Sequence, residues 1–171
     1  MNISKILLVF VLALSIVSCK KEDDGVIPFV FNQTNLEGTY ELNYYKSTET
    51  ETIQFNGAEI VSVTTTTGDT FGINVTFLEN RTYITDGAYR EVFTTVVGGQ
   101  TTMEGSDIIV EDNITRSYSV SSGTSRLTLD GDIYEVPSFS ETGMTITFEN
   151  TETDSNGDTT VFNEEFRFTK I

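Results

Sequence analysis

The sequence contains no histidine, no tryptophan and only one cysteine. Without histidine, the chain lacks the usual general base near neutral pH and the most common protein ligand of metal ions. A Ser–His pair is impossible, and no nucleophile-elbow, Walker or dinucleotide-binding glycine pattern occurs. Carboxylates are the only catalytic groups left, and nothing in the sequence brings two of them together. We therefore expect a protein that is not an enzyme and has no cofactor.

Basic residues are scarce as well. Ten Lys and Arg stand against 26 Asp and Glu, which gives a formal net charge of −16. This balance argues against nucleic acid as a partner, because phosphate binding requires clustered Lys and Arg. It also argues against a basic amphipathic helix that would hold the domain on anionic lipid. Solubility is the simplest interpretation of the acidic surplus.

The first 18 residues have the pattern of a secretory signal peptide. Lys5 supplies the positive charge, residues 6–17 supply the apolar run, and the small residue Ser18 follows. The apolar run is too short for a membrane-spanning helix, which needs about 20 residues. We expect residues 1–18 to be removed.

The only cysteine, Cys19, comes directly after this segment. The run Ile16-Val17-Ser18-Cys19 resembles the lipobox of bacterial lipoproteins. The resemblance implies a diacylglycerol on the Cys19 sulfur and a third acyl chain, such as palmitate, on the new amino group, so that the protein is held on a membrane. The alternative is an ordinary signal peptide with an incidental cysteine.

The next residues are expected to form the tether, within a lipidated N-terminal segment of residues 19–35. Residues 20–24 are Lys-Lys-Glu-Asp-Asp, which resembles the charged tract of surface-exposed lipoproteins of Bacteroidota. That resemblance implies that the protein is located at the outer membrane of the cell envelope, on its outer face. The alternative is a solvated linker, which has the same kind of sequence. Residues 26–31 are apolar, and we expect them to pack on the domain or close one end of it.

Residues 36–171 read as one all-β domain. Thr, Val, Ile, Tyr and Phe dominate, and no stretch has the 3.6-residue apolar period of a helix. Apolar and polar residues alternate instead, which is typical of antiparallel strands with one buried face. The expected inward sets are Tyr40, Leu42 and Tyr44; Phe71, Ile73, Val75 and Phe77; Leu127 and Leu129; Met144, Ile146 and Phe148; and Phe166 and Phe168.

Turn dipeptides interrupt these strands at short intervals. They are Asn56-Gly57, Gly68-Asp69, Asp86-Gly87, Gly98-Gly99, Ser122-Gly123, Asp130-Gly131 and Asn156-Gly157. Such dipeptides favour tight hairpins, so consecutive strands should be neighbours. The result is an antiparallel meander of roughly eight to ten strands. It can form a sandwich or a barrel, and we predict an up-and-down β-barrel because closure removes exposed edges.

The opening of this domain, Leu36-Glu37-Gly38-Thr39-Tyr40-Glu41-Leu42, is similar to that of lipocalin-like domains. Residues 75–84 resemble the central hairpin of small lipocalin-like lipoproteins of Bacteroidota, and residues 117–148 resemble their last strands. The likeness implies a lipocalin-like barrel that can hold a ligand, without naming one. Tyr40 stands where the family usually has tryptophan; it would have to close the barrel end, with a hydroxyl that needs a partner.

One turn also contains possible metal ligands. Asp154, Asn156 and Asp158 place oxygen atoms at alternate positions, as calcium sites do. The glycine between the last two comes too early for the glycine position of an EF-hand loop. A hairpin turn explains the same residues and is the default interpretation.

Two functions fit these observations. The first is a membrane-anchored lipoprotein that binds a small, hydrophobic molecule inside its barrel, at residues that the sequence does not identify. The second is a structural or partner-binding envelope lipoprotein whose barrel is filled with side chains.

Overall fold

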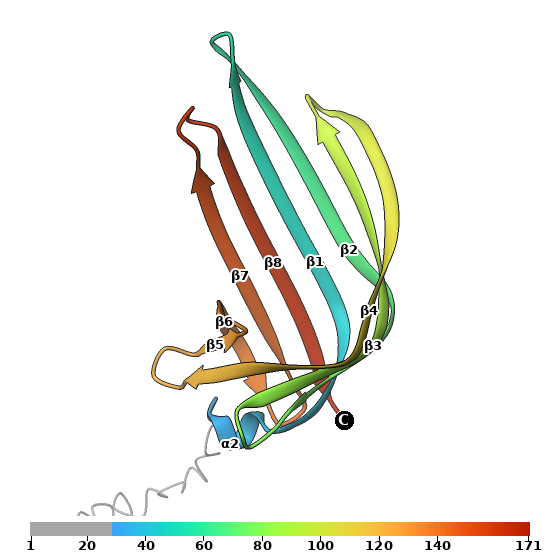
Figure 1. Ribbon diagram of the computed structural model, residues 1–171, viewed down its shortest axis with the longest axis vertical. Helices are drawn as coiled ribbons and strands as arrows, with labels where there is room; N and C mark the ends of the chain where they lie inside the picture. The colour runs from blue at the N-terminus through green and yellow to red at the C-terminus, as the bar shows by residue number, and fades with distance from the viewer. Residues whose placement is uncertain (1–28) are drawn as a thin grey trace, which may run out of the picture.

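The computed structural model describes residues 29–171, in which eight antiparallel strands form an up-and-down β-barrel (Figure 1). Each strand pairs with the next one in sequence, and the last pairs with the first to close the ring. The predicted fold class is confirmed, with a strand count at the lower end of the expected range. The strands are β1 (Gly38–Phe55), β2 (Ala58–Phe77), β3 (Thr82–Val97), β4 (Gln100–Ser121), β5 (Arg126–Leu129), β6 (Asp132–Ser140), β7 (Gly143–Thr153) and β8 (Thr159–Lys170).

The strands differ greatly in length. β4 has 22 residues, whereas its neighbour β5 has 4 and pairs with it only over the four positions that end at Ser121. Residues 100–117 of β4 therefore have a strand partner on the β3 side alone. In the same way, residues 148–153 of β7 pair with β8 and not with β6. Figure 1 shows the long strands extending well beyond the short β5–β6 pair.

Five of the seven predicted turn dipeptides connect strands. At the first of them, Asn56 and Gly57 both have positive φ, at 50° and 79°, as a primed hairpin turn requires. The predictions at Gly68-Asp69 and Asp86-Gly87 are wrong, because these dipeptides lie inside β2 and β3. The pairing shifts register near both, so they mark β-bulges that bend long strands.

The predicted alternation is correct in β2, where Ile73, Val75 and Phe77 are buried. In β1 it fails after Leu42. The pairing of β1 with β8 shifts register between Leu42 and Tyr44, so Tyr45 points inward in place of Tyr44. Tyr44 instead lies under the guanidinium of Arg167 on the outer surface, 4.2 Å from its ring centre.

A short helix, α2 (Gln33–Leu36), covers one end of the barrel. Its N-cap is Asn32, whose side chain accepts a 2.8 Å hydrogen bond from the backbone N–H of Asn35. Leu36 is fully buried beneath the strands. The Lys170 ammonium donates to the Asn35 carbonyl at 3.0 Å, which ties the helix to the last strand.

The residues before α2 also pack on the barrel. Phe29 and Phe31 both contact the ring of Phe139, at centroid distances of 5.1 Å. Phe31 belongs to the main core. The predicted packing of the apolar segment is therefore confirmed for residues 29–31. The part of the chain that packs on the barrel thus begins before residue 36.

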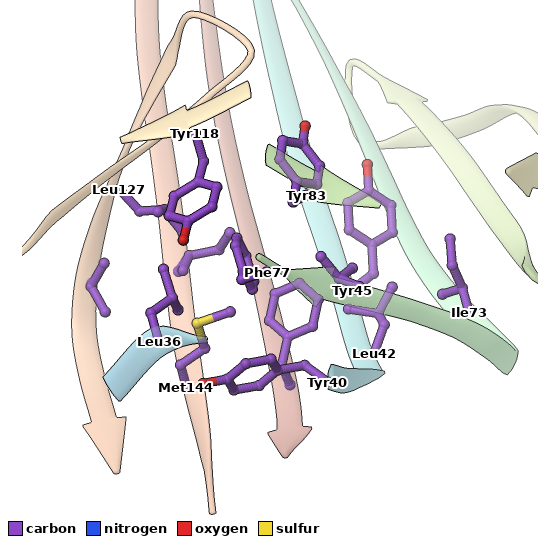
Figure 2. Close-up of a cluster of buried hydrophobic side chains, with 14 of the residues drawn as sticks. Leu36, Tyr40, Leu42, Tyr45, Ile73, Phe77, Tyr83, Tyr118, Leu127 and Met144 are labelled. Atoms are coloured by element: carbon purple, nitrogen blue, oxygen red, sulfur yellow. The ribbon is translucent and has the colours of Figure 1, made fainter. Parts of the chain in front are cut away.

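The core occupies the α2 end of the barrel (Figure 2). Its most deeply buried side chains come from α2 and from strands on all sides of the ring: Leu36, Tyr40, Phe77, Leu127 and Ile146. Figure 2 shows Tyr40 at the base, with its hydroxyl pointing toward Met144, while the hydroxyls of Tyr45 and Tyr83 point away from the base. The barrel is thus filled at one end and becomes more polar toward the other.

Candidate ligand-binding cavity

A cavity of about 310 Å³ lies inside the barrel, above this core. All eight strands contribute to its wall, because each places alternate residues on the inner face. The wall is mostly apolar and aromatic; its apolar members include Leu42, Ile73, Val75, Ile109, Leu129, Met144, Ile146, Phe166 and Phe168. The interior of the barrel is therefore not completely filled by its own side chains.

The floor of the cavity is aromatic. The ring of Phe77 packs edge-to-face on Tyr40 and on Tyr118, at centroid distances of 5.8 and 5.1 Å. The Tyr118 hydroxyl donates to the Leu78 carbonyl at 2.8 Å. The Tyr40 hydroxyl is buried and has no hydrogen-bond partner among the described residues, although the sequence led us to expect one. Burial raises the pKa of Tyr40 to about 12.

One side of the wall carries a charged network. Arg116 donates to both carboxylate oxygens of Glu111, at 3.1 and 3.2 Å, and to the hydroxyl of Thr85 at 2.9 Å. Thr85 in turn donates to Glu111 at 2.9 Å. Burial acts to raise the pKa of Glu111, but the hydrogen bonds from Arg116 and Thr85 outweigh it and hold this pKa below its ordinary value. Each member of this network is thus held by the other two.

Another part of the interior carries phenols and carboxylates. Tyr89 donates to Glu91 at 2.8 Å, and Tyr134 donates to Glu164 at 3.4 Å. Tyr89 and Tyr134 line the cavity, whereas Glu91 and Glu164 are not part of its wall and reach it only through these phenols. Burial is the main cause that raises the pKa of Glu164, and the negative charge of Glu91 adds to it. Burial likewise raises the pKa of Tyr45 to about 12.

The predicted calcium candidate lies at the turn between β7 and β8, away from this cavity. Asp154 Oδ1 accepts from the backbone N–H groups of Asn156 and Asp158, at 2.8 and 3.0 Å. Asp158 Oδ1 accepts from the N–H of Gln54 at 2.7 Å. These bonds occupy oxygens that a calcium ion would need, which favours the hairpin-turn alternative. Among residues 29–171, no group of three or more acidic, histidine or cysteine side chains is placed to hold a metal ion.

Cys19 and the expected signal peptide of residues 1–18 lie outside the described residues. Within residues 29–171, no helix is both long and apolar enough to cross a membrane.

Sequence reasoning nominated no residue of the cavity wall. The apolar part follows from the inward sets, but the polar part needed a different signal. Glu164 occupies an inward position between Phe162 and Phe166, and an acid at such a position is the sequence sign of a polar group inside a barrel. The Glu111–Arg116 pair has no such sign, because a register shift in β4 lies between the two residues and breaks the alternation there.

Comparison of the chain with family models, with curated proteins and with solved structures returns no match. The cavity is therefore the main guide to function.

Proposed function

We propose that the protein is a lipid-anchored, lipocalin-like lipoprotein of the cell envelope that binds a small, largely apolar molecule inside its barrel. The observation that supports this most is the cavity of about 310 Å³, lined by apolar and aromatic side chains and a few polar groups. Small-molecule sites have this composition and begin at about this volume. A compact ligand with a polar group at one end fits the apolar floor and the charged upper wall.

Binding without chemistry is the simplest use of this cavity. The chain has no histidine, and its one cysteine is Cys19. Of the acids in the wall, Glu111 is held by Arg116 and Thr85, so it is poorly placed to act as an acid or base.

The anchor determines which end of the barrel faces the membrane in this proposal. The chain enters the described part at Phe29, which packs on Phe139 beside α2. Between Cys19 and Phe29 the chain can span at most about 35 Å, at roughly 3.5 Å per residue. An acylated Cys19 would thus hold the domain near an outer-membrane surface by its filled end.

A matched pair of neighbouring residues tests the binding proposal. Ile109 lines the cavity, whereas Ile108 points outward and is 70% exposed. We expect Ile109→Trp to fill part of the cavity and to weaken the binding of 4-phenylbutanol at least tenfold, as measured by calorimetry. Loss of this much apolar contact should reduce the binding free energy by more than about 1.4 kcal/mol. Ile108→Trp should leave binding unchanged. If both variants bind the alcohol as well as wild type, the barrel interior is not the site.

A specific observation also favours the second function, partner binding. Within the described part of the chain, residues 100–117 of β4 have no strand partner on one side, and Ile108 and Val110 are 70% and 68% exposed there. An unpaired, apolar edge is a template for another strand. If this edge binds a protein, Ile108→Asp should release that protein from the membrane-extracted complex on a native gel, while Ile109→Trp should not.

A further inference from the structure

We propose that the molecule held in the barrel is an organic cation, an amine or quaternary ammonium group on an apolar body. This inference rests on the proposed binding function and adds the charge of the ligand. It is carried by the wall of the cavity, where acids outnumber bases, and by aromatic rings beside two carboxylates that form no salt bridge in the described part of the chain.

The charge around the cavity is predominantly negative. Its wall contains three acids, Glu111, Asp130 and Asp132, and one base, Arg116. Arg116 is already bonded to both oxygens of Glu111, and its Nε lies 4.0 Å from Asp130. An anionic ligand would meet a surplus of acids and would have to compete with Glu111 for Arg116. Anions are therefore disfavoured.

Two further carboxylates, Glu91 and Glu164, stand behind the cavity phenols. Neither takes part in any salt bridge of residues 29–171. The groups that act on Glu164 are the phenols of Tyr45 and Tyr134 and the charges of Glu91 and Asp132. A half-buried carboxylate that faces other carboxylates is costly, and a cation beside it removes that cost. No salt bridge within residues 29–171 supplies a positive charge at this position.

Aromatic rings lie in the cavity wall and directly behind it, next to these acids; Tyr89 and Phe166 line the cavity, whereas Tyr45 and Phe71 pack against them. Tyr45 stacks on Phe166 at 4.9 Å and meets Tyr89 edge-to-face at 5.7 Å, while Phe71 stacks on Tyr89 at 5.9 Å. Ring faces attract ammonium groups, and rings combined with carboxylates form the usual recognition site for alkylated amines. A bare metal ion would need several converging oxygens, whereas rings fit an organic cation.

The experiment compares three probes with the same apolar body: 4-phenylbutylammonium, 4-phenylbutanol and 4-phenylbutanoate. Calorimetry at about 0.15 M salt limits the long-range attraction of the acidic protein for any cation. We expect the ammonium to bind about tenfold more tightly than the alcohol, the gain expected for one desolvated cation–carboxylate or cation–π contact. The carboxylate should bind more weakly than the alcohol.

A matched pair of variants assigns the preference to the interior. Glu164→Gln should remove most of the preference for the ammonium, so that the ammonium and the alcohol bind that variant with similar affinity. Glu165→Gln changes the net charge by the same amount on the outer face, where Glu165 bonds Arg167 at 2.6 Å, and should change neither affinity. Glu91→Gln is the second interior variant, expected to reduce the ammonium preference.

The outcomes separate this inference from the binding function. Equal affinities for the three probes, or tightest binding of the carboxylate, would overturn the inference and leave the cavity as an apolar site. An ammonium preference unaffected by Glu164→Gln and Glu91→Gln would overturn it as well, because the preference would come from elsewhere. Failure of all three probes to bind would overturn both proposals.

Discussion

The hydroxyl of Tyr89 donates a 2.8 Å hydrogen bond to Glu91, two residues further along the same inner face of β3. Burial is the main cause that raises the pKa of Tyr89, and the bond to Glu91 and its charge act in the same direction. The phenol therefore remains a proton donor at neutral pH and holds a carboxylate at the side of the cavity. At the base, Tyr40 has no such partner among the described residues. This contrast separates a polar upper wall from an apolar floor.

Removal of the Tyr40 hydroxyl should stabilise the protein. We expect Tyr40→Phe to raise the free energy of unfolding by about 1 kcal/mol, because the variant no longer buries an unpaired hydroxyl. Tyr118→Phe is the matched control: it removes a 2.8 Å hydrogen bond to the Leu78 carbonyl and should lower the stability by about 1 kcal/mol. Urea denaturation followed by circular dichroism measures both. Equal losses would mean that Tyr40 has a partner after all.

A side chain at Gly87 should be poorly tolerated. Gly87 has a φ of +118°, and a Cβ there would collide with the backbone carbonyl of Gly72 on the neighbouring strand. We expect Gly87→Ala to lower the free energy of unfolding by roughly 2 to 4 kcal/mol, through strain and loss of pairing at the bulge.

Gly123→Ala is the control for this prediction, since Gly123 has open space around its Cβ position and no positive φ. It should change the stability by less than about 0.5 kcal/mol. Thermal melts of the two variants compare them directly. A Gly87→Ala protein as stable as wild type would show that β2 and β3 do not approach each other this closely.

The pH dependence of stability should reveal Glu164. Its pKa is raised in the folded state, chiefly by burial, so the folded protein binds this proton more tightly than the unfolded chain. The stability that this group contributes is therefore greatest at low pH and is lost as the pH rises through the folded pKa. The Glu164→Gln variant has no carboxyl group at this position, so its stability does not fall with pH for this reason. Without ligand, it should melt at a higher temperature than wild type at pH 8, with the difference shrinking toward pH 5.

Glu165→Gln provides the comparison on the outer face. It removes an acid bonded to Arg167 at the surface, where such pairs contribute about 0 to 1 kcal/mol. We expect no gain in melting temperature at pH 8. A gain as large as that of Glu164→Gln would assign the effect to net charge and contradict burial of Glu164 as its cause.

The lipid anchor can be tested independently of the barrel. Intact-mass analysis of the membrane-extracted protein should show a chain that begins at Cys19 with its acyl chains attached, because two or more chains give stable anchoring. Cys19→Ser should be found in the soluble fraction or with residues 1–18 retained. Wild-type protein recovered soluble with a free thiol would contradict the anchor.

The fold could be predicted from the sequence because its main signal, alternation, depends only on burial. Ile73, Val75 and Phe77 are all buried as expected. The errors occur where β-bulges shift the register. Tyr45 replaces Tyr44 inside, and Asp86-Gly87 lies within a strand because pairing continues on both sides of it. A bulge depends on strand–strand contacts, which local sequence does not encode.

The polar part of the site could not be predicted from the sequence, for a related reason. The charged network joins Thr85 on β3 to Glu111 and Arg116 on β4, and only the observed register brings them together. The cavity itself depends on how closely side chains fill a closed barrel. That is a property of volume in three dimensions, which an alternating pattern does not determine.

The most direct test of the proposed cavity is a methyl NMR titration of isoleucine-labelled protein with 4-phenylbutylammonium. Ile73, Ile109 and Ile146 line the cavity, whereas Ile108 and Ile133 lie on the outer surface with 70% and 55% of their area exposed. We predict saturable shifts of the three inner methyl groups and none of the outer two. Shifts confined to Ile108 and Ile133, or no shifts at millimolar probe, would contradict a ligand-binding barrel.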